Sequence, residues 1–518
     1  MLKTGFLRPG IFVSMTEKEN VMYASRRNLL KAIAAAPVAV GAASVHAAPT
    51  GMPRKWDQEF DIVIVGAGGG GLAAAAYARE AGLSTVILEK TMLVGGSTLL
   101  SGGQWSVADS AEQRARGIKD SDDIFLKDML KTGQNKNDPE LVKAMAASSR
   151  IVYEFVTQKL NTKPDTVTAV SGMSVPRAHH FVPSKLIKAL YDWDKSQKVV
   201  FLMKTAAERL VWDAEKSCIA GVRAASNGKT LFIRAKKGVL LASGGFSRNP
   251  KLLEKYNPLM ATVDPEGGIG NTGDGLLMAQ AYGADVRDTQ YIKATFGYRP
   301  DPKKYNTDTL HAYYNGAIIV NTDGKRFVNE SISYKLLSDA ALQQKDGKAF
   351  LFFNEPIRVT MRDTREKFKR LLSPMDNGGE IDYCIRGETI EEVAKKAGID
   401  PKELEETVRR YNAFAEKGVD EDFGRTSLTS GYGKLLPFEE GPYFLYAVRP
   451  RLIATYCGLC INTKAQVLDV FGEPISRLYA TGELIGGVHG AAYMTGTAVA
   501  KAMAFGRIGA LEIAAIKD

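Results

Sequence analysis

Short apolar runs alternate with glycine-rich turns and helical stretches along much of the chain. Residues 60–65 form a continuous, β-branched apolar run of the kind that makes a buried parallel strand. Six residues of glycine and alanine follow, then a helical pattern over 72–81 and a second apolar run over 85–88. The order strand, turn, helix, strand predicts an α/β fold with a Rossmann-like unit.

Further segments carry the same kinds of pattern. Residues 184–195 are predicted to be a helix, and 143–160 and 390–415 show helical apolar spacing with charged outer faces, with Pro401 opening a helix. Residues 315–320 are strand-like. The loop before residue 184 carries a pair of histidines, His179 and His180, in a predicted irregular segment.

Composition is that of a large globular protein. The 518 residues include 45% hydrophobic and 24% charged residues, which predicts a sizeable core in two or more domains and excludes disordered and fibrous classes. Four cysteines are too few for a disulfide framework. The pair Cys457 and Cys460 lacks the further cysteines or histidines that a metal or cluster site needs, so no metal site is expected.

The net charge of +10 does not indicate a nucleic-acid partner. The first 48 residues hold six basic and two acidic residues, a net +4, which leaves +6 for the remainder. No run of five to eight Lys or Arg residues occurs, so we expect a solvated surface and no nucleic acid.

The N-terminal segment has the features of an export signal. Arg26 and Arg27 precede an Ala-rich apolar run over 32–43, and Val45-His46-Ala47 forms a small-residue cleavage site. The segment 1–48 therefore predicts twin-arginine export through the Tat translocase and a periplasmic location. The apolar run is too short to predict a stable membrane span, which needs about 20 residues.

The glycine-rich turn predicts a dinucleotide site. Gly66 permits the tight turn, Gly68 lets the backbone approach a pyrophosphate, and Gly71 lets the following helix pack closely on the strand. Glu89, at the end of the second strand and about 20 residues after the glycines, is placed to accept hydrogen bonds from ribose hydroxyls.

Later segments favour FAD over NAD. Residues 95–98 and 101–103 are rich in Gly, Ser and Thr, whose small side chains let backbone amides lie against a flat ring system. Two more apolar runs end in glycines, over 238–245 and 478–483. A grip spread over so many segments indicates a tightly held flavin.

These motifs, in this order and spacing, resemble those of the flavoprotein subunits of the fumarate reductase and succinate dehydrogenase superfamily. Soluble periplasmic fumarate reductases and 3-ketosteroid Δ1-dehydrogenases are the most similar groups. The resemblance covers about 57–510 and rests on further motifs: Thr272-Gly-Asp-Gly275, Gly324-Lys-Arg-Phe-Val-Asn-Glu330, Thr481-Gly-Glu483 and Gly486-Gly-Val-His-Gly490. It implies a discontinuous Rossmann-like FAD-binding domain, 57–289 and 455–518, with an inserted α+β capping domain over 290–454.

The resemblance also implies which residues hold FAD. Glu89 and Lys90 would lie at the adenosine ribose, with Ala207 near the adenine. The flavin, the ribityl chain and the phosphates would be held by Gly66, Gly68, Gly71, Ser97, Thr98, Gly102, Gly103, Gly245, Asp274, Glu483, Thr497 and Val499.

The sequence departs from fumarate reductases at the substrate positions. The proton-donating arginine of that family falls on Tyr334, and a second, carboxylate-binding arginine falls on Tyr493. Two expected histidines are replaced by Thr295 and Ala454. Because a dicarboxylate needs charged, bidentate donors, these four changes argue against fumarate.

Asn-Glu-Ser-x-x-Tyr, ending at Tyr334, is instead the pattern of 3-ketosteroid Δ1-dehydrogenases. That resemblance implies that Tyr334 transfers the proton next to a ketone, and that Tyr493 and Gly496 hold the ketone oxygen. We therefore expect an exported FAD-dependent oxidoreductase that acts on CH–CH bonds and interconverts a saturated and an α,β-unsaturated carbonyl compound. The substrate would be a cyclic ketone, with hydride transfer at flavin N5.

Two alternatives stay open. A periplasmic reductase of an unsaturated carboxylic acid would use Tyr334 as proton donor and Lys335 or Arg177 to hold the carboxylate. A flavin electron-transfer module would have no carbon substrate, although an inserted cap that excludes water speaks against it. Each catalytic hypothesis requires a separate electron partner, a quinone or small cytochrome, because the chain has no haem-attachment motif.

Overall fold

The computed structural model describes residues 50–300, 309–364, 366–429 and 431–517. The predicted export signal, 1–48, lies outside the described residues. The chain divides into two units, Met1–Ala48 and Pro49–Asp518, and the description below concerns the second.

An eight-stranded sheet dominates the part that contains the glycine-rich turn. Six strands lie in the order β17-β18-β9-β1-β2-β6, with β7 and β8 attached through β9. β1 pairs in parallel with β2 and β9, and β18 pairs in parallel with β9. The α/β class and the Rossmann-like unit are therefore confirmed. The strands are β1 (Gln58–Val65), β2 (Thr85–Glu89), β6 (Val200–Met203), β7 (Thr205–Asp213), β8 (Cys218–Ser226), β9 (Lys229–Leu241), β17 (Gln466–Leu468) and β18 (Pro474–Ala480).

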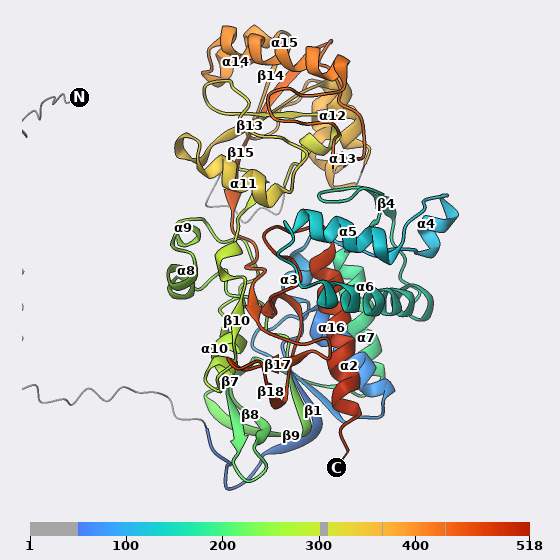
Figure 1. Cartoon of the computed structure of the whole chain (residues 1–518), viewed down its shortest axis with the longest axis vertical. Coiled ribbons are helices and arrows are strands. Elements are labelled where there is room, and N and C mark those ends of the chain that lie inside the picture. The colour runs from blue at the N-terminus through green and yellow to red at the C-terminus, as the bar shows by residue number, and fades with distance from the viewer. Residues whose placement is uncertain (1–49, 301–308, 365, 430, 518) are drawn as a thin grey trace, which may run out of the picture. The chain divides into compact units, whose positions relative to one another are not determined.

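Two helices from opposite ends of the sequence pack together beside this sheet. The helix predicted after the glycine-rich turn is α2 (Gly69–Glu80), and the last helix is α16 (Thr497–Ala514). Figure 1 shows them side by side. A Cβ added at Gly506 would lie 2.4 Å from the Gly70 carbonyl oxygen, so glycine is required for this close approach. The C-terminal segment is thus built into the same unit as the first strand.

The remaining helices of this part surround the sheet and its carboxyl edge. The predicted helix over 143–160 is α6, and it continues into a π-helical turn, Phe155–Lys159. The helices are α3 (Gly96–Leu100), α4 (Ala111–Ala115), α5 (Asp122–Thr132), α6 (Pro139–Glu154), α7 (Pro183–Ser196), α8 (Pro250–Tyr256), α9 (Pro258–Ala261) and α10 (Asp274–Gln280).

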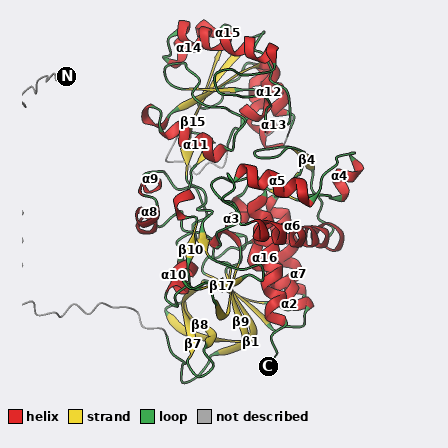
Figure 2. Cartoon of the chain, viewed as in Figure 1, coloured by secondary structure: helices red, strands yellow, loops and turns green. Residues whose placement is uncertain are grey.

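The middle of the chain forms a second, antiparallel sheet. Strands lie in the order β11-β15-β13-β12, and β14 also pairs with β15. Helices accompany this sheet, as the colours of Figure 2 show. Its elements are β11 (Thr295–Tyr298), β12 (Ile318–Val320), β13 (Ala349–Asn354), β14 (Cys384–Gly387), β15 (Tyr443–Arg451), α11 (Tyr334–Leu342), α12 (Glu355–Arg362), α13 (Glu366–Leu372), α14 (Ile390–Ala397) and α15 (Pro401–Lys417).

The two sheets have separate hydrophobic cores. One core draws its buried residues from 62–294 and 452–513, and the other from 296–448 together with Tyr493. Two cores are what a discontinuous domain with an insertion requires. The predicted boundaries 57–289, 290–454 and 455–518 stay predictions.

One predicted element differs in the structure. The predicted loop around His179 is a strand, β5 (Ala178–His180), which pairs with both β3 (Gln104–Ser106) and β4 (Thr166–Thr168). The histidines are held there by pairing that is distant in sequence. Among the described residues, no helix combines the length and the apolar character that crossing a membrane requires.

Candidate active site

The glycine-rich turn leaves open space at the start of α2. Gly68 caps the helix in an extended conformation, and no side chain caps it or places an acid in its first turn. An ideal Cβ at Gly68 would have no atom within 4 Å, whereas one at Gly71 would lie 2.0 Å from the Gly66 carbonyl oxygen. Gly71 is therefore needed for packing. Gly68 leaves room at a helix N-terminus, where an anionic group is stabilised.

Glu89 ends β2 with its carboxylate fixed beside this turn. Its Oε2 accepts a hydrogen bond from the Ala67 amide at 3.0 Å, and its Oε1 accepts one from the Thr91 amide at 2.8 Å. The residue is 8% exposed. Both bonds hold the carboxylate at the carboxyl edge of the sheet, which is the position expected for a ribose-binding acid.

The structure brings Lys90 and Asp274 together. The Lys90 ammonium lies 2.6 Å from the Asp274 carboxylate and donates a second bond of 2.6 Å to Thr272 Oγ1. Asp274 is the first residue of α10. This pair ties the end of β2 to the start of α10.

Glu483 lies at the centre of a polar network that joins four segments. Asn271 Nδ2 donates to Glu483 Oε2 at 3.0 Å and to Ser97 Oγ at 3.2 Å. The Thr455 amide donates to Glu483 Oε1 at 3.0 Å, and burial raises the pKa of Glu483. A Cβ at Gly245 would lie 2.2 Å from the same carboxylate oxygen. Asn271 had no recognisable role in the sequence, because only the fold places it here.

The other predicted cofactor residues lie at different points of the same region. Thr98 Oγ1 accepts a hydrogen bond from the Gly69 amide at 3.3 Å, next to the glycine-rich turn. Gly102 is open, with no atom within 4 Å of an ideal Cβ. Gly103 lies against Phe181, Ala207 is on β7, and Thr497 and Val499 are in the first turn of α16.

A cluster of aromatic side chains lies where the second sheet meets the start of α16. Tyr334, the first residue of α11, stacks on His311 with ring centroids 5.3 Å apart and meets Tyr493 edge-on at 5.9 Å. Tyr456 stacks on Tyr493 at 4.6 Å, and His489 contacts both at 5.2 Å. Tyr334 and Tyr493, about 160 residues apart in sequence, are therefore neighbours.

The Tyr493 hydroxyl lies at the N-terminus of α16. Its oxygen accepts a hydrogen bond from the Gly496 amide at 2.9 Å and a longer one from the Ala498 amide at 3.5 Å. Burial raises the pKa of Tyr493 to about 12, although these amides act in the opposite direction. The predicted partners Tyr493 and Gly496 are in contact. The Gly496 amide donates to the phenol oxygen, and a side-chain interaction with Tyr334 also acts on this hydroxyl.

Burial dominates the proton affinity of the cluster. It raises the pKa of Tyr334 and of Tyr456 well above 10, and the interaction with Tyr334 only partly offsets the effect at Tyr456. Tyr456 also adopts φ 55°, a left-handed conformation that is uncommon for a bulky residue. Both phenols are therefore protonated at neutral pH and are available as proton donors.

A buried lysine touches the cluster. Lys335 Nζ lies 4.4 Å from the ring centroid of Tyr456 and 5.8 Å from that of Tyr334. It donates hydrogen bonds to Thr295 Oγ1 at 2.6 Å and to the Lys293 carbonyl at 3.1 Å. The position predicted to have lost a histidine, Thr295, thus holds the ammonium group.

Residues 61–499 match the protein family described as FAD binding domain. A fumarate reductase (cytochrome) of Shewanella frigidimarina is 32% identical over 459 residues, which cover 88% of this chain and 77% of that protein. The chain belongs to the FAD-binding flavoprotein family of the fumarate reductases. FAD is therefore its cofactor, and the flavoprotein is an oxidoreductase that acts on carbon–carbon double bonds.

Other similar proteins carry different substrates in their names. A 4-oxocyclohexanecarboxylate 2-dehydrogenase of Sinomonas cyclohexanicum is 28% identical, and the alignment covers 86% of this chain and 90% of that protein. The open conformation of a flavocytochrome c3 fumarate reductase superposes with a TM-score of 0.70 at 28% identity, covering 94% of this chain and 80% of the other. A 3-ketosteroid-Δ4-(5α)-dehydrogenase of Rhodococcus jostii shares the fold, with a TM-score of 0.73, 24% identity, and coverage of 90% of this chain and 99% of its own.

The residues present fit FAD. In addition to the open space at Gly68 and Gly102, buried polar atoms without a protein partner among the described residues include Ser243 Oγ, Ser247 Oγ and His489 Nε2. Such atoms are costly to bury unless a ligand or water satisfies them. Burial lowers the pKa of His489 well below its ordinary value, so the flavoprotein presents it as a neutral imidazole.

Arg177 is a structural residue of the flavoprotein and does not hold a substrate carboxylate. Its guanidinium is fully buried and pairs with Asp120 at 2.6 Å and Asp128 at 2.7 Å. These two carboxylates occupy the donors that a ligand would need. The prediction that Arg177 could bind a substrate carboxylate is therefore wrong.

Tyr456 and His311 were missed from the sequence. Tyr456 lies two residues after Ala454, where the sequence departs from fumarate reductases. Its nearness to that position was the one feature of the sequence that could have pointed to it. His311 precedes two tyrosines in a segment without a motif.

Cys457 and Cys460 are free thiols, and the described residues contain no group of three or more potential metal ligands.

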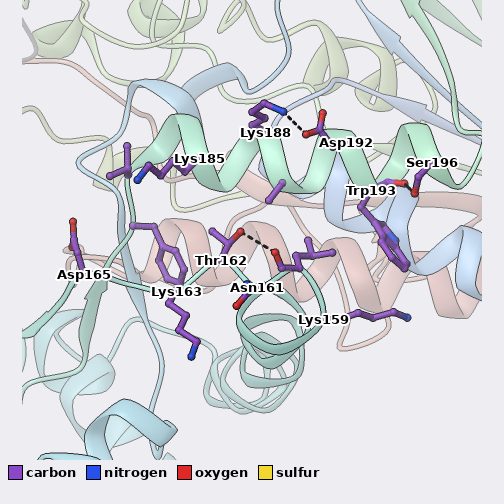
Figure 3. A pocket seen from close by; sticks show the side chains of 14 residues that line it. Lys159, Asn161, Thr162, Lys163, Asp165, Lys185, Lys188, Asp192, Trp193 and Ser196 are labelled. Carbon is purple, nitrogen blue, oxygen red and sulfur yellow. Dashed lines mark hydrogen bonds and ion pairs between the residues drawn. The ribbon is translucent and has the colours of Figure 1, made fainter.

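A surface groove of about 740 Å³ lies between α7 and the π-helical turn, outside the aromatic cluster. Figure 3 shows four lysines around it: Lys159, Lys163, Lys185 and Lys188. Lys159 pairs with Glu80, and Lys188 pairs with Asp192. These lysines account for part of the positive charge of the flavoprotein and contact none of the tyrosines of the cluster.

Proposed function

We propose that the flavoprotein interconverts a saturated carbonyl compound and its α,β-unsaturated counterpart, and that the carbonyl belongs to a cyclic ketone. The observation that carries this proposal is the contact between Tyr334 and Tyr493, which take the positions of two expected arginines of fumarate reductases, and the stacking of Tyr456 on Tyr493. Phenols suit a neutral carbonyl better than a dicarboxylate, which requires bidentate cations. The similarity to the 4-oxocyclohexanecarboxylate 2-dehydrogenase of Sinomonas cyclohexanicum supports the same substrate class.

Tyr493 would hold the carbonyl oxygen. Its hydroxyl would donate to the carbonyl oxygen, while the Gly496 and Ala498 amides donate to the phenol oxygen. A chain of hydrogen bonds that begins at a helix N-terminus strengthens as negative charge develops on the carbonyl oxygen. Tyr493 and Gly496 would therefore act in series on the oxyanion.

Tyr334 would move the proton at the carbon next to the carbonyl. Because its pKa is raised well above 10, it holds its proton at neutral pH and serves as the donor when the double bond is reduced. FAD, when bound, supplies the hydride chemistry at the other carbon. The protein supplies the proton, the oxyanion donor and a buried site.

Location and electron supply are part of the proposal. The twin-arginine motif of 1–48 supports periplasmic export, with a separate quinone or small cytochrome as electron partner. Such a partner would exchange electrons with the flavin and so return it to its starting oxidation state after each reaction.

A substrate panel tests the proposal. Purified holoenzyme would be mixed anaerobically with saturated cyclic ketones, and its reduced form with cyclic enones and unsaturated acids, while flavin absorbance is followed in a stopped-flow instrument. We expect reaction with ketones or enones. Reaction with unsaturated acids alone, strengthened in Tyr334→Arg, would overturn the ketone assignment, and no reaction across the panel would indicate an electron-transfer module.

A further inference from the structure

Lys335 is buried in an unusual setting. The residue is 1% exposed and lies in the first turn of α11, directly after Tyr334. Its two hydrogen-bond acceptors, Thr295 Oγ1 and the Lys293 carbonyl, are both neutral. The face of the Tyr456 ring occupies another side of the ammonium, 4.4 Å from Nζ. The positive charge is therefore not neutralised by any of these contacts.

Charged groups near Lys335 act from a distance. Glu483 and Asp339 favour its protonated form, and Lys293 disfavours it. Asp339 pairs with Lys293 and not with Lys335. Since two hydrogen bonds and a ring face already surround the ammonium, it is poorly placed to grip a substrate carboxylate as well. The rings of Tyr456 and Tyr334 lie 4.4 and 5.8 Å from Nζ, measured to their centroids.

We propose that Lys335 is a positioning residue that holds a positive charge against Tyr456 and Tyr334 and thereby makes their hydroxyls stronger acids. The proposal rests on the proposed function of Tyr334. When the Tyr334 O–H bond breaks and a C–H bond forms next to the carbonyl, a phenolate is left, and it regains a proton from water after the reaction. An ammonium at this range stabilises the phenolate and so eases the transfer.

The charge on Lys335 would be lost near neutral pH. Burial lowers the pKa of Lys335 to about 7. Below that pH the ammonium is present and supports the phenolate, and above it the neutral amine gives no such support. The rate of proton donation should therefore fall on the alkaline side.

Fluorine NMR of 3-fluorotyrosine-labelled holoenzyme tests the charge without any substrate. The Tyr456 resonance, assigned with Tyr456→Phe, should shift with a midpoint near pH 7 in the wild type, and this transition should be absent in Lys335→Met and Lys335→Arg. Its phenolate transition should occur about 1–3 pH units lower in Lys335→Arg than in Lys335→Met. A wild-type resonance that does not move near pH 7, or that still moves in Lys335→Met, would overturn the inference.

Lys501 is the matched control. It is also buried, its Nζ donates to the Ile485 carbonyl at 2.9 Å, and burial lowers its pKa to about 8. If the midpoint belongs to Lys335, Lys501→Arg should retain it. If the transition is lost in Lys501→Arg and kept in Lys335→Met, the titrating group is Lys501, and the inference about Lys335 is wrong.

The pH dependence of kcat/KM then tests the effect on proton transfer. With a substrate from the panel, the wild type should lose activity above pH 7, Lys335→Arg should lose this alkaline limb, and Lys335→Met should be roughly 10- to 1,000-fold slower below pH 7. A limb that persists in Lys335→Arg would contradict the inference. If no substrate reacts, the proposed function fails, and the NMR titration still decides whether Lys335 acts on the tyrosines.

Discussion

The region predicted to bind FAD, formed by the glycine-rich turn with Glu89, Asp274 and Glu483 and called the flavin cradle below, differs in construction from the aromatic cluster. In the cradle, polar side chains satisfy one another across segments, as Lys90 does with Asp274 and Asn271 with Glu483, and glycines leave room for the ligand. In the cluster, buried rings surround hydroxyls whose pKa values are strongly raised. Holding a cofactor requires shape and satisfied polar groups, whereas proton transfer requires a group with an adjusted proton affinity.

Substitution of Tyr334 should give the largest difference between the cluster and the cradle. Tyr334→Phe removes the hydroxyl from the cluster and leaves the cradle intact, so kcat should fall by about 100- to 10,000-fold with an unchanged flavin content. Rapid-mixing kinetics and the ratio of flavin to protein absorbance measure the two effects. Tyr411→Phe, a buried tyrosine of the second core away from the cluster, should react like the wild type. An equal decrease of kcat in Tyr334→Phe and Tyr411→Phe would contradict a role of Tyr334 in proton transfer.

Tyr493 should give the next largest effect. Tyr493→Phe removes the donor that would meet the carbonyl oxygen, and loss of one oxyanion donor lowers kcat by about 100- to 1,000-fold. The pH profile of Lys335→Arg, which lacks the alkaline limb expected from Lys335, provides the check, because a donor with a pKa of about 12 predicts no loss from Tyr493 ionisation at neutral pH. An unchanged kcat in Tyr493→Phe would place the carbonyl elsewhere.

Two glycines separate folding from cofactor binding within the cradle. Gly71→Ala places a Cβ 2.0 Å from the Gly66 carbonyl oxygen and should lower the free energy of unfolding by about 1–3 kcal/mol. Gly68→Ala meets no protein atom within 4 Å, so the apoprotein should keep its stability and bind FAD more weakly. Thermal unfolding of the apoprotein and FAD titration measure these effects. Loss of apoprotein stability in Gly68→Ala would contradict the open cradle.

The smallest effect concerns a buried histidine outside both regions. Burial lowers the pKa of His179 to about 4, so the unfolded chain binds more protons between pH 6.5 and 4, and stability falls as the pH decreases through that range. His179→Gln should remove about 1 kcal/mol of this loss at pH 5.5. Chemical denaturation at several pH values measures it, with His180→Gln as the neighbouring control that keeps the dependence.

Local sequence determined the cradle. A strand, glycines at fixed spacing, a helix and a terminal acid are neighbours along the chain, so the turn at Gly66, Gly68 and Gly71 and the place of Glu89 at the strand end were predictable from pattern alone, while their role in binding FAD stays a prediction. The parallel sheet was also predictable in kind from its apolar runs, whereas the second sheet followed only from the family resemblance, which implied an α+β insertion. His179 was placed in a loop since the strand β5 exists only through pairing with β3 and β4.

Only the tertiary structure decided the aromatic cluster. Tyr334 was found through its motif, but Tyr456, His311 and Lys335 come from separate segments, and they meet only when α11, the segment before residue 312, the segment after β15 and the loop before α16 come together. Arg177 shows the converse, because a plausible ligand in the sequence is consumed by Asp120 and Asp128. Charge and proton affinity depend on burial and on partners distant in sequence, and these are properties of the folded chain.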